Sequence, residues 1–265
     1  MFDRYSRAIT YLRISVTDFC NLRCGYCMPS KAPQRLRHQD ILSFEEIAAL
    51  VAVAVPLGID KVRITGGEPL TRRHISRLVG MLAALPGIRD LSLTTNGTLL
   101  ADQAQSLRDA GLHRLNISLD AVDPERFRVR SGGGDLRTVL AGIEAAQAAG
   151  FPGTKLNCVI EKSPDEPDAR GVAEFARTHG LELRFIRRMD LAAGHFWQVL
   201  GGDGGDCPRC NRLRLSSDGR LFPCLFGNDS YSIRELGMEA ALRAAVEGKP
   251  QSGQRSTQCF YTIGG

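Results

Sequence analysis

The chain has 265 residues, of which 43% are hydrophobic and 24% are charged, and its formal net charge is +5 at pH 7. This size and composition are ordinary for a globular protein with one large domain or two modest ones. The chain shows no apolar run of membrane-spanning length, no signal-peptide core at the N-terminus and no dense basic block suited to a nucleic-acid groove. We therefore expect a cytoplasmic protein that binds neither membranes nor nucleic acid.

Short β-branched runs alternate with stretches of helical periodicity over residues 10–190. The expected strands are Thr10–Val16, Lys61–Thr65, Asp90–Thr95, Arg114–Leu119, Thr154–Ile160 and Glu182–Ile186. The expected helices are Phe44–Val55, Arg73–Ala84, Leu99–Ala110, Leu136–Ala149 and Asp168–His179. This alternation predicts an α/β fold with a parallel sheet covered by helices.

The texture of the chain changes after residue 190, so we expect a first domain over 1–190 and a smaller C-terminal region over 191–265. In that region the pattern predicts a β-hairpin with strands Arg212–Ser216 and Arg220–Phe222. One helix is expected over Ser232–Val246, followed by an extended tail over Gln251–Gly265.

Three thiols, those of Cys20, Cys24 and Cys27, follow the first expected strand within eight residues. Cysteine thiolates are the usual ligands of iron–sulfur clusters, and three ligands leave one iron of a cubane cluster open. A zinc knuckle and a set of buried free thiols are the alternatives. Zinc usually takes four ligands, and no His or fourth Cys lies nearby in the sequence.

The C-x3-C-x-aromatic-C pattern resembles the signature of the radical S-adenosylmethionine (SAM) superfamily. The resemblance implies that SAM binds the open iron of a 4Fe–4S cluster and is cleaved to a 5′-deoxyadenosyl radical. It also implies a partial (β/α)6 TIM-like radical SAM barrel. The implied SAM contacts are Tyr26, Gly66, Gly67, Glu68, Pro69, Ser118 and Met189. For Met189, core packing is the alternative.

A second group of thiols comprises Cys207, Cys210 and Cys224. We interpret it as a second 4Fe–4S cluster with an open iron that binds a substrate atom; a structural cluster with a fourth ligand elsewhere is the alternative. Arg212 and Arg214 follow it on one face of an expected strand. They form either a phosphate clamp or a solvated charged edge.

At this point the resemblance narrows to the GTP 3′,8-cyclases, which carry out the first step of molybdenum-cofactor biosynthesis. It runs nearly end to end. The matching segments are Leu12–Asp18, Cys27–Pro29, Arg63–Leu70, Leu93–Gly97, Asn116–Asp120, Lys155–Asn157, Arg184–Ile186, Met189–Asp190, Cys210–Leu215 and Gly264–Gly265. The resemblance implies GTP as the substrate, an external electron donor and a C-terminal Gly264-Gly265 that reaches the active site. The GTP contacts that it implies are Arg13, Lys61, Arg63, Thr94, Lys155, Arg184, Arg212 and Arg214.

Two departures from this family stand out. Residues 191–206 replace a segment that is several tens of residues longer in the family, and Arg187-Arg188 stand where an acidic and an aromatic residue are usual. Two alternatives therefore stay open: a radical SAM peptide- or metabolite-modifying enzyme with an auxiliary cluster, and a degenerate cluster-bearing electron-transfer subunit. The sequence leaves the oligomeric state open, with a homodimer as the alternative to a monomer, and assigns no role to Cys158 or Cys259.

Overall fold

The computed structural model describes residues 1–28, 35–151 and 153–263. Its strands are β1 (Tyr11–Ser15), β2 (Lys61–Thr65), β3 (Asp90–Thr95), β4 (Arg114–Ser118), β5 (Lys155–Ile160), β6 (Glu182–Arg187), β7 (Arg212–Leu215), β8 (Arg220–Phe222) and β9 (Tyr231–Ser232). The first six agree with the expected strands to within one residue at each end. They are short runs of largely apolar or β-branched residues, which suit the buried strands of a parallel sheet.

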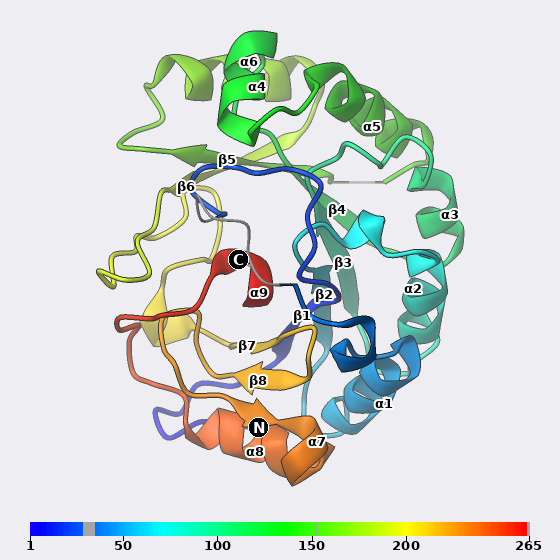
Figure 1. Cartoon of the computed structure of the whole chain (residues 1–265), viewed down its shortest axis with the longest axis vertical. Coiled ribbons are helices and arrows are strands. Elements are labelled where there is room, and N and C mark those ends of the chain that lie inside the picture. Colours follow the sequence, from blue (N-terminus) through cyan, green and yellow to red (C-terminus); the bar gives the residue numbers. More distant parts are fainter. Residues whose placement is uncertain (29–34, 152, 264–265) are drawn as a thin grey trace.

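All nine strands within the described residues form one sheet, in the order β6-β5-β4-β3-β2-β1-β7-β8-β9. Every pair from β6 through β1 to β7 is parallel, whereas β8 and β9 pair antiparallel. The sheet curves around a central space, and the helices lie along its outer side (Figure 1). The predicted α/β fold is confirmed, with β1 to β6 as the partial barrel.

In the part of the chain that the structure describes, six α-helices follow the barrel strands. They are α1 (Phe44–Ala54), α2 (Ile75–Ala83), α3 (Ala104–Asp109), α4 (Pro124–Ser131), α5 (Leu136–Ala148) and α6 (Pro167–Thr178). Five of them correspond to expected helices, although α3 starts five residues later than Leu99. Helix α4 was not expected; it begins at the N-cap Asp123 and ends at Gly132, whose φ is 69°. Aliphatic side chains such as Leu50, Ile64 and Ile117 are fully buried between sheet and helices. No helix in the described part of the chain combines the length and apolar character needed to cross a membrane.

The strand register shows which residues lie side by side on the inner face of the barrel. Arg13 on β1 lies between Arg63 on β2 and Arg214 on β7. Two residues earlier, Tyr11 lies between Lys61 and Arg212 in the same way. Because alternate residues of a strand point to the same face, these two rows form one continuous surface. Further around the barrel, Ser118, Asn157 and Arg184 are aligned on β4, β5 and β6.

The C-terminal region extends the sheet on the β1 side. The predicted hairpin is confirmed as β7 and β8. The single helix expected over Ser232–Val246 is wrong, because Gly237, with φ of 82°, divides it into α7 (Ile233–Leu236) and α8 (Met238–Glu247). The tail is also not wholly extended: it forms α9 (Phe260–Ile263), which contacts β1 inside the curve of the sheet (Figure 1).

Residues 191–206 return to the barrel. Bridges join Phe185 to Leu200 and Asp190 to His195. The guanidinium carbon of Arg187 lies 4.0 Å from the ring centroid of Trp197. This segment therefore packs beside β6 along one edge of the central space.

Two mid-helix glycines allow a matched test of this packing. A Cβ at Gly142 in α5 would lie 2.4 Å from the carbonyl oxygen of Gly97, whereas a Cβ at Gly80 in α2 would meet its nearest atom only at 4.0 Å. We expect Gly142→Ala to destabilise the protein by about 1–3 kcal/mol through overpacking, and Gly80→Ala to stabilise it by up to about 1 kcal/mol. Anaerobic denaturant titration of both variants measures the difference. Equal effects would contradict the packing of α5 on the loop after β3.

Candidate active site

A cavity of about 370 Å³ occupies the centre of the curved sheet. Both groups of thiols line it: Cys20, Cys24, Cys27, Cys207, Cys210 and Cys224. So do most of the other predicted site residues, namely Arg13, Tyr26, Lys61, Arg63, Gly66, Gly67, Glu68, Thr94, Ser118, Arg184, Met189, Arg212 and Arg214. Pro69 and Lys155 do not line it, and Gly264 and Gly265 lie outside the described residues. The fold thus brings segments from both ends of the chain to one space.

The first group of thiols sits in a compact loop after β1. The backbone N–H groups of Cys27 and Met28 donate to the carbonyl oxygen of Cys24, at 2.9 and 3.0 Å. Burial raises the pKa of the Cys24 thiol to about 12, assisted by the nearby charges of Asp120 and Cys20. Burial, together with the neighbouring thiols, likewise raises the pKa of Cys27 to about 12. This site favours neutral thiols unless a metal cation replaces their protons.

No three His, Cys, Asp or Glu side chains within the described residues are gathered closely enough to hold a single metal ion. A tetrahedral zinc site needs its sulfurs about 2.3 Å from one atom. A cubane cluster binds each thiolate through a different iron, so its ligands stand further apart. Three thiols on one wall of the cavity are the donor set of a cubane cluster that keeps one iron open.

Gly66 and Gly67 pack against the loop that carries these thiols. A Cβ at Gly67 would lie 2.3 Å from the carbonyl oxygen of Phe19, and one at Gly66 would lie 2.8 Å from that of Thr17. The N–H of Gly67 donates to Thr17 at 2.7 Å, and that of Glu68 donates to Phe19 at 2.8 Å. Because they have no side chain, the glycines let the segment after β2 bond to the backbone of the thiol loop. They also leave the cavity open.

Glu68 is fully buried beneath the cavity. Its carboxylate accepts hydrogen bonds from the N–H of Leu70 at 3.0 Å, the hydroxyl of Thr95 at 2.7 Å and the N–H of Asn96 at 2.7 Å. Burial raises the pKa of Glu68 to about 7 despite these bonds. Near neutral pH this carboxyl is therefore present in both its neutral and its ionised form.

Two polar side chains that sequence reasoning does not single out support the first thiol group. The Tyr26 hydroxyl donates to Asp120 at 2.8 Å, and the other oxygen of Asp120 accepts from the N–H of Val159 at 2.7 Å. The side-chain amide of Asn96 lies 3.8 Å from the sulfur of Cys20. Asn96 directly follows β3 and Asp120 lies two residues after β4, and this position at the carboxyl ends of barrel strands is a sequence signal that indicates a site.

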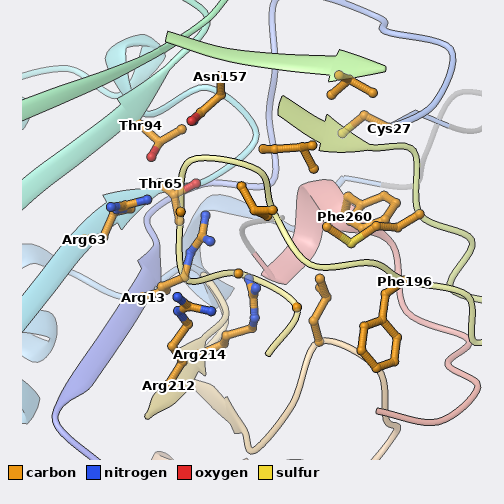
Figure 2. A pocket seen from close by; sticks show the side chains of 18 of the residues that line it. Arg13, Cys27, Arg63, Thr65, Thr94, Asn157, Phe196, Arg212, Arg214 and Phe260 are labelled. Carbon is orange, nitrogen blue, oxygen red and sulfur yellow. The ribbon is translucent and has the colours of Figure 1, made fainter. Parts of the chain in front are cut away.

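Four arginines form a basic array on one side of the cavity: Arg13, Arg63, Arg212 and Arg214 (Figure 2). The ring of Tyr11 lies beneath Arg63 and Arg212, each with its guanidinium carbon 5.6 Å from the ring centroid. Burial lowers the pKa of Arg214 to about 10, with the Arg212 charge acting in the same direction. Burial and the Arg214 charge also hold the pKa of Arg13 well below its usual range. Crowded, buried cations of this kind favour the binding of an anion.

The remaining predicted substrate contacts lie around this array. Lys61 pairs with Asp90 at 3.0 Å, and Lys155 forms an ion pair with Glu182 on β6. The Nε of Arg184 donates to the Gly201 carbonyl at 3.2 Å. The hydroxyl of Thr94 is buried in the cavity wall and has no hydrogen-bond partner among the described residues. A buried hydroxyl of this kind usually has a partner, which a ligand in the cavity could provide.

The second group of thiols belongs to the C-terminal region. Cys207 begins a short 3-10 helix (Cys207–Arg209), and the N–H of Cys210 donates to the Cys207 carbonyl at 3.1 Å. Cys224 follows β8, and its sulfur accepts from the N–H of Phe226 at 3.4 Å. Because these three residues line the cavity that Cys27 also lines, the two groups share one space.

The C-terminal tail enters the same space. The guanidinium of Arg214 donates to the Ile263 carbonyl at 3.3 Å, and Phe260 lines the cavity. In Figure 2, α9 lies between the basic array and Cys27, with Phe260 beside Cys27. The two residues that follow Ile263 lie outside the described part of the chain.

Comparison with known proteins agrees with this geometry. The family model of the radical SAM superfamily matches residues 14–176. The GTP 3′,8-cyclase of Moorella thermoacetica is 38% identical over 324 aligned positions, which cover 100% of both chains. That of Pseudomonas entomophila is 38% identical over 306 positions, covering 94% of this chain and 91% of the relative.

The chain belongs to the GTP 3′,8-cyclase family of the radical SAM superfamily. The alignment with the Moorella relative is longer than the 265 residues of this family member, so the relative has segments that are absent here.

Solved structures show the same fold. Streptococcus suis SuiB bound to S-adenosylmethionine has a TM-score of 0.63 at 15% identity, covering 93% of this chain and 65% of SuiB. The anSMEcpe protein with bound AdoMet and the Kp18Cys peptide also has a TM-score of 0.63 at 15% identity, covering 91% of this chain and 81% of that one.

The two glycines nearest the first thiols give a second matched test. We expect Gly67→Ala to lose most of its iron and its SAM binding, because the new Cβ collides with the backbone of Phe19. Gly25, between Cys24 and Tyr26, has no atom within 4 Å of its Cβ position, so Gly25→Ala should retain both. Iron analysis and SAM titration after anaerobic loading measure the outcome. Normal iron and SAM binding in Gly67→Ala would contradict this account of the loop.

Proposed function

We propose that this chain converts GTP into (8S)-3′,8-cyclo-7,8-dihydroguanosine 5′-triphosphate, the first step of molybdenum-cofactor biosynthesis. One observation carries the proposal: both groups of thiols and the four-arginine array line a single cavity. The arginines suit a triphosphate, and the two groups of thiols suit clusters that would bind SAM and a purine. Many curated relatives named GTP 3′,8-cyclase, including those of Moorella and Pseudomonas, support the same substrate.

Cys20, Cys24 and Cys27 would hold the 4Fe–4S cluster that binds SAM. When bound, the cluster and SAM supply the one-electron reductive cleavage that starts the reaction. The buried carboxylate of Glu68 would attract the SAM ammonium, and Gly66, Gly67 and Pro69 would be further SAM contacts. Tyr26, held by Asp120, would lie near the adenine, with Ser118 and Met189 as further contacts.

The basic array would bind the triphosphate. Arginine presents paired N–H donors that match phosphate oxygens, and a polyanion would relieve the repulsion among Arg13, Arg63, Arg212 and Arg214. Lys61, Lys155 and Arg184 would add charge around it, and the buried hydroxyl of Thr94 is suited to the ribose or the base. In this arrangement the protein fixes the ribose relative to SAM, which replaces a bimolecular encounter by a positioned one.

Cys207, Cys210 and Cys224 would hold a second 4Fe–4S cluster with an open iron for the purine. We propose that residues 1–190 form the radical SAM domain and residues 191–265 the region of the second cluster, with Gly264 and Gly265 completing the site. The tail and residues 191–206 would exclude water from the cavity, since Phe260 and Phe196 both line it.

Several parts of the proposal extend beyond the cavity. An external electron donor would supply the electron, and the reducing conditions that thiols and clusters need favour the cytoplasm. A homodimer is proposed as the assembly to test against the monomer. The shortened 191–206 segment makes a changed nucleotide the main rival within the same chemistry. A radical SAM peptide- or metabolite-modifying enzyme and a cluster-bearing electron carrier are the rivals outside it.

A nucleotide panel tests the reaction. The protein is loaded anaerobically with iron and sulfide, then incubated with dithionite, SAM and GTP, ATP or guanosine. We expect about eight irons per chain, 5′-deoxyadenosine, and a cyclised product from GTP that mass analysis identifies. Guanosine should react at least tenfold more slowly, because it lacks the triphosphate that the arginines bind.

An Arg212→Met/Arg214→Met variant should lose the preference for GTP over guanosine, whereas Arg137→Met, on an exposed helix face, should keep it. Absence of 5′-deoxyadenosine with every nucleotide would favour the electron carrier. Its formation without any cyclised nucleotide would favour a different substrate.

SAM binding should depend on pH through Glu68. Because the pKa of this buried carboxyl is about 7, it is mainly neutral at pH 6 and mainly ionised at pH 8. Only the ionised form attracts an ammonium group, so SAM affinity should rise about tenfold from pH 6 to pH 8. Equilibrium SAM titration of the loaded protein measures the change. Glu68→Gln should bind weakly and show no such rise, while the exposed Glu174→Gln should follow the parent protein; a pH-independent affinity in the parent would contradict this role.

A further inference from the structure

Lys249 is a buried cation beside the second group of thiols. It follows α8, and only 1% of its surface is exposed. Its ammonium donates to the carbonyl oxygens of Arg212 and Pro223, each at 2.7 Å. Arg212 lies two residues after Cys210, and Pro223 directly precedes Cys224. The ammonium therefore ties together the two segments that carry these thiols.

The charges around Lys249 come partly from the same thiols. A lysine ammonium has three donors, and the two carbonyls use two of them. Burial lowers the pKa of Lys249, whereas the charges of Cys210 and Cys224 act to raise it and that of Arg7 acts to lower it. A buried cation is stabilised by a nearby negative charge, which thiolate ligands at Cys210 and Cys224 would supply.

We propose that Lys249 is a positioning residue for the second cluster, whose buried ammonium holds the Cys210 and Cys224 segments together and raises the reduction potential of the cluster. The inference rests on the proposed function, because it requires the second cluster. Its physical basis is that one-electron reduction makes a cluster more negative, and a buried cation bonded to the segments that carry two of its ligands favours that state. The effect is strong because the water-excluded surroundings screen the charge poorly.

The experiment isolates the second cluster. Cys20, Cys24 and Cys27 are changed to Ala, and in this background Lys249→Met, Lys249→Arg and Lys162→Met are compared with the unaltered lysines. Met removes the charge at similar length, Arg retains it, and Lys162 is an exposed lysine outside the cavity. Each protein is loaded anaerobically, its iron is counted, and the cluster is titrated with dithionite while its reduced signal is followed by electron paramagnetic resonance.

We expect about four irons in each protein. In Lys249→Met the one-electron reduction equilibrium should become at least tenfold less favourable, a fall in potential of about 59 mV or more. Lys249→Arg should recover most of the potential, and Lys162→Met should match the background. Loss of the cluster in Lys249→Met but not in Lys249→Arg would also support the proposal.

Two results would overturn it. The first is an unchanged potential in Lys249→Met with its cluster intact. The second is loss of the cluster in both Lys249 variants, because then the exact shape of lysine, not its charge, would be required. A background protein without iron would contradict the second cluster itself, and the iron count reveals that failure before any potential is measured.

Discussion

The site depends on the pairing of β1 with two partners at once. β1 pairs in parallel with β2 on one side and with β7 on the other, although β7 comes from about 200 residues later in the chain. This pairing places Arg63 and Arg214 on either side of Arg13, and it brings Cys207, Cys210 and Cys224 to the cavity that the first thiols line. Without it, the chain would have two separate groups of thiols and no basic array.

Several side chains that line this cavity have pKa values shifted toward their neutral forms. Burial and mutual repulsion lower the pKa values of Arg13 and Arg214, and burial raises those of Cys24, Cys27 and Glu68. Each shift marks a group whose charged form is disfavoured by burial. The ligands that would stabilise these charged forms have complementary chemistry: polyanions for the arginines, metal cations for the thiols and an ammonium for the glutamate. Perturbed groups gathered in one cavity are typical of functional sites.

Local patterns predicted most of the barrel. The six strands follow from apolar and β-branched runs, and the start of α1 follows from Ser43, which forms a capping box with Glu46. Gly111, Gly150 and Gly180 follow α3, α5 and α6 with positive φ, which is typical of the residue that ends a helix. Helix α4 was missed because it is short and highly charged, although Asp123-Pro124 is a recognisable start. The break at Gly237 was missed because an isolated glycine inside a helical pattern is often tolerated.

The sequence by itself determined which chemistry is available: two groups of three thiols, the glycines before Glu68, and two arginines on alternate positions of one strand. It determined these because spacing, side-chain type and strand alternation are local properties of the chain. Only the tertiary structure decided that Gly67 is needed for contact with Phe19, that Lys155 pairs with Glu182, and that Lys249 is buried with its ammonium on the Arg212 and Pro223 carbonyls. Each of these joins segments far apart in sequence, and no local pattern records which distant segments will meet.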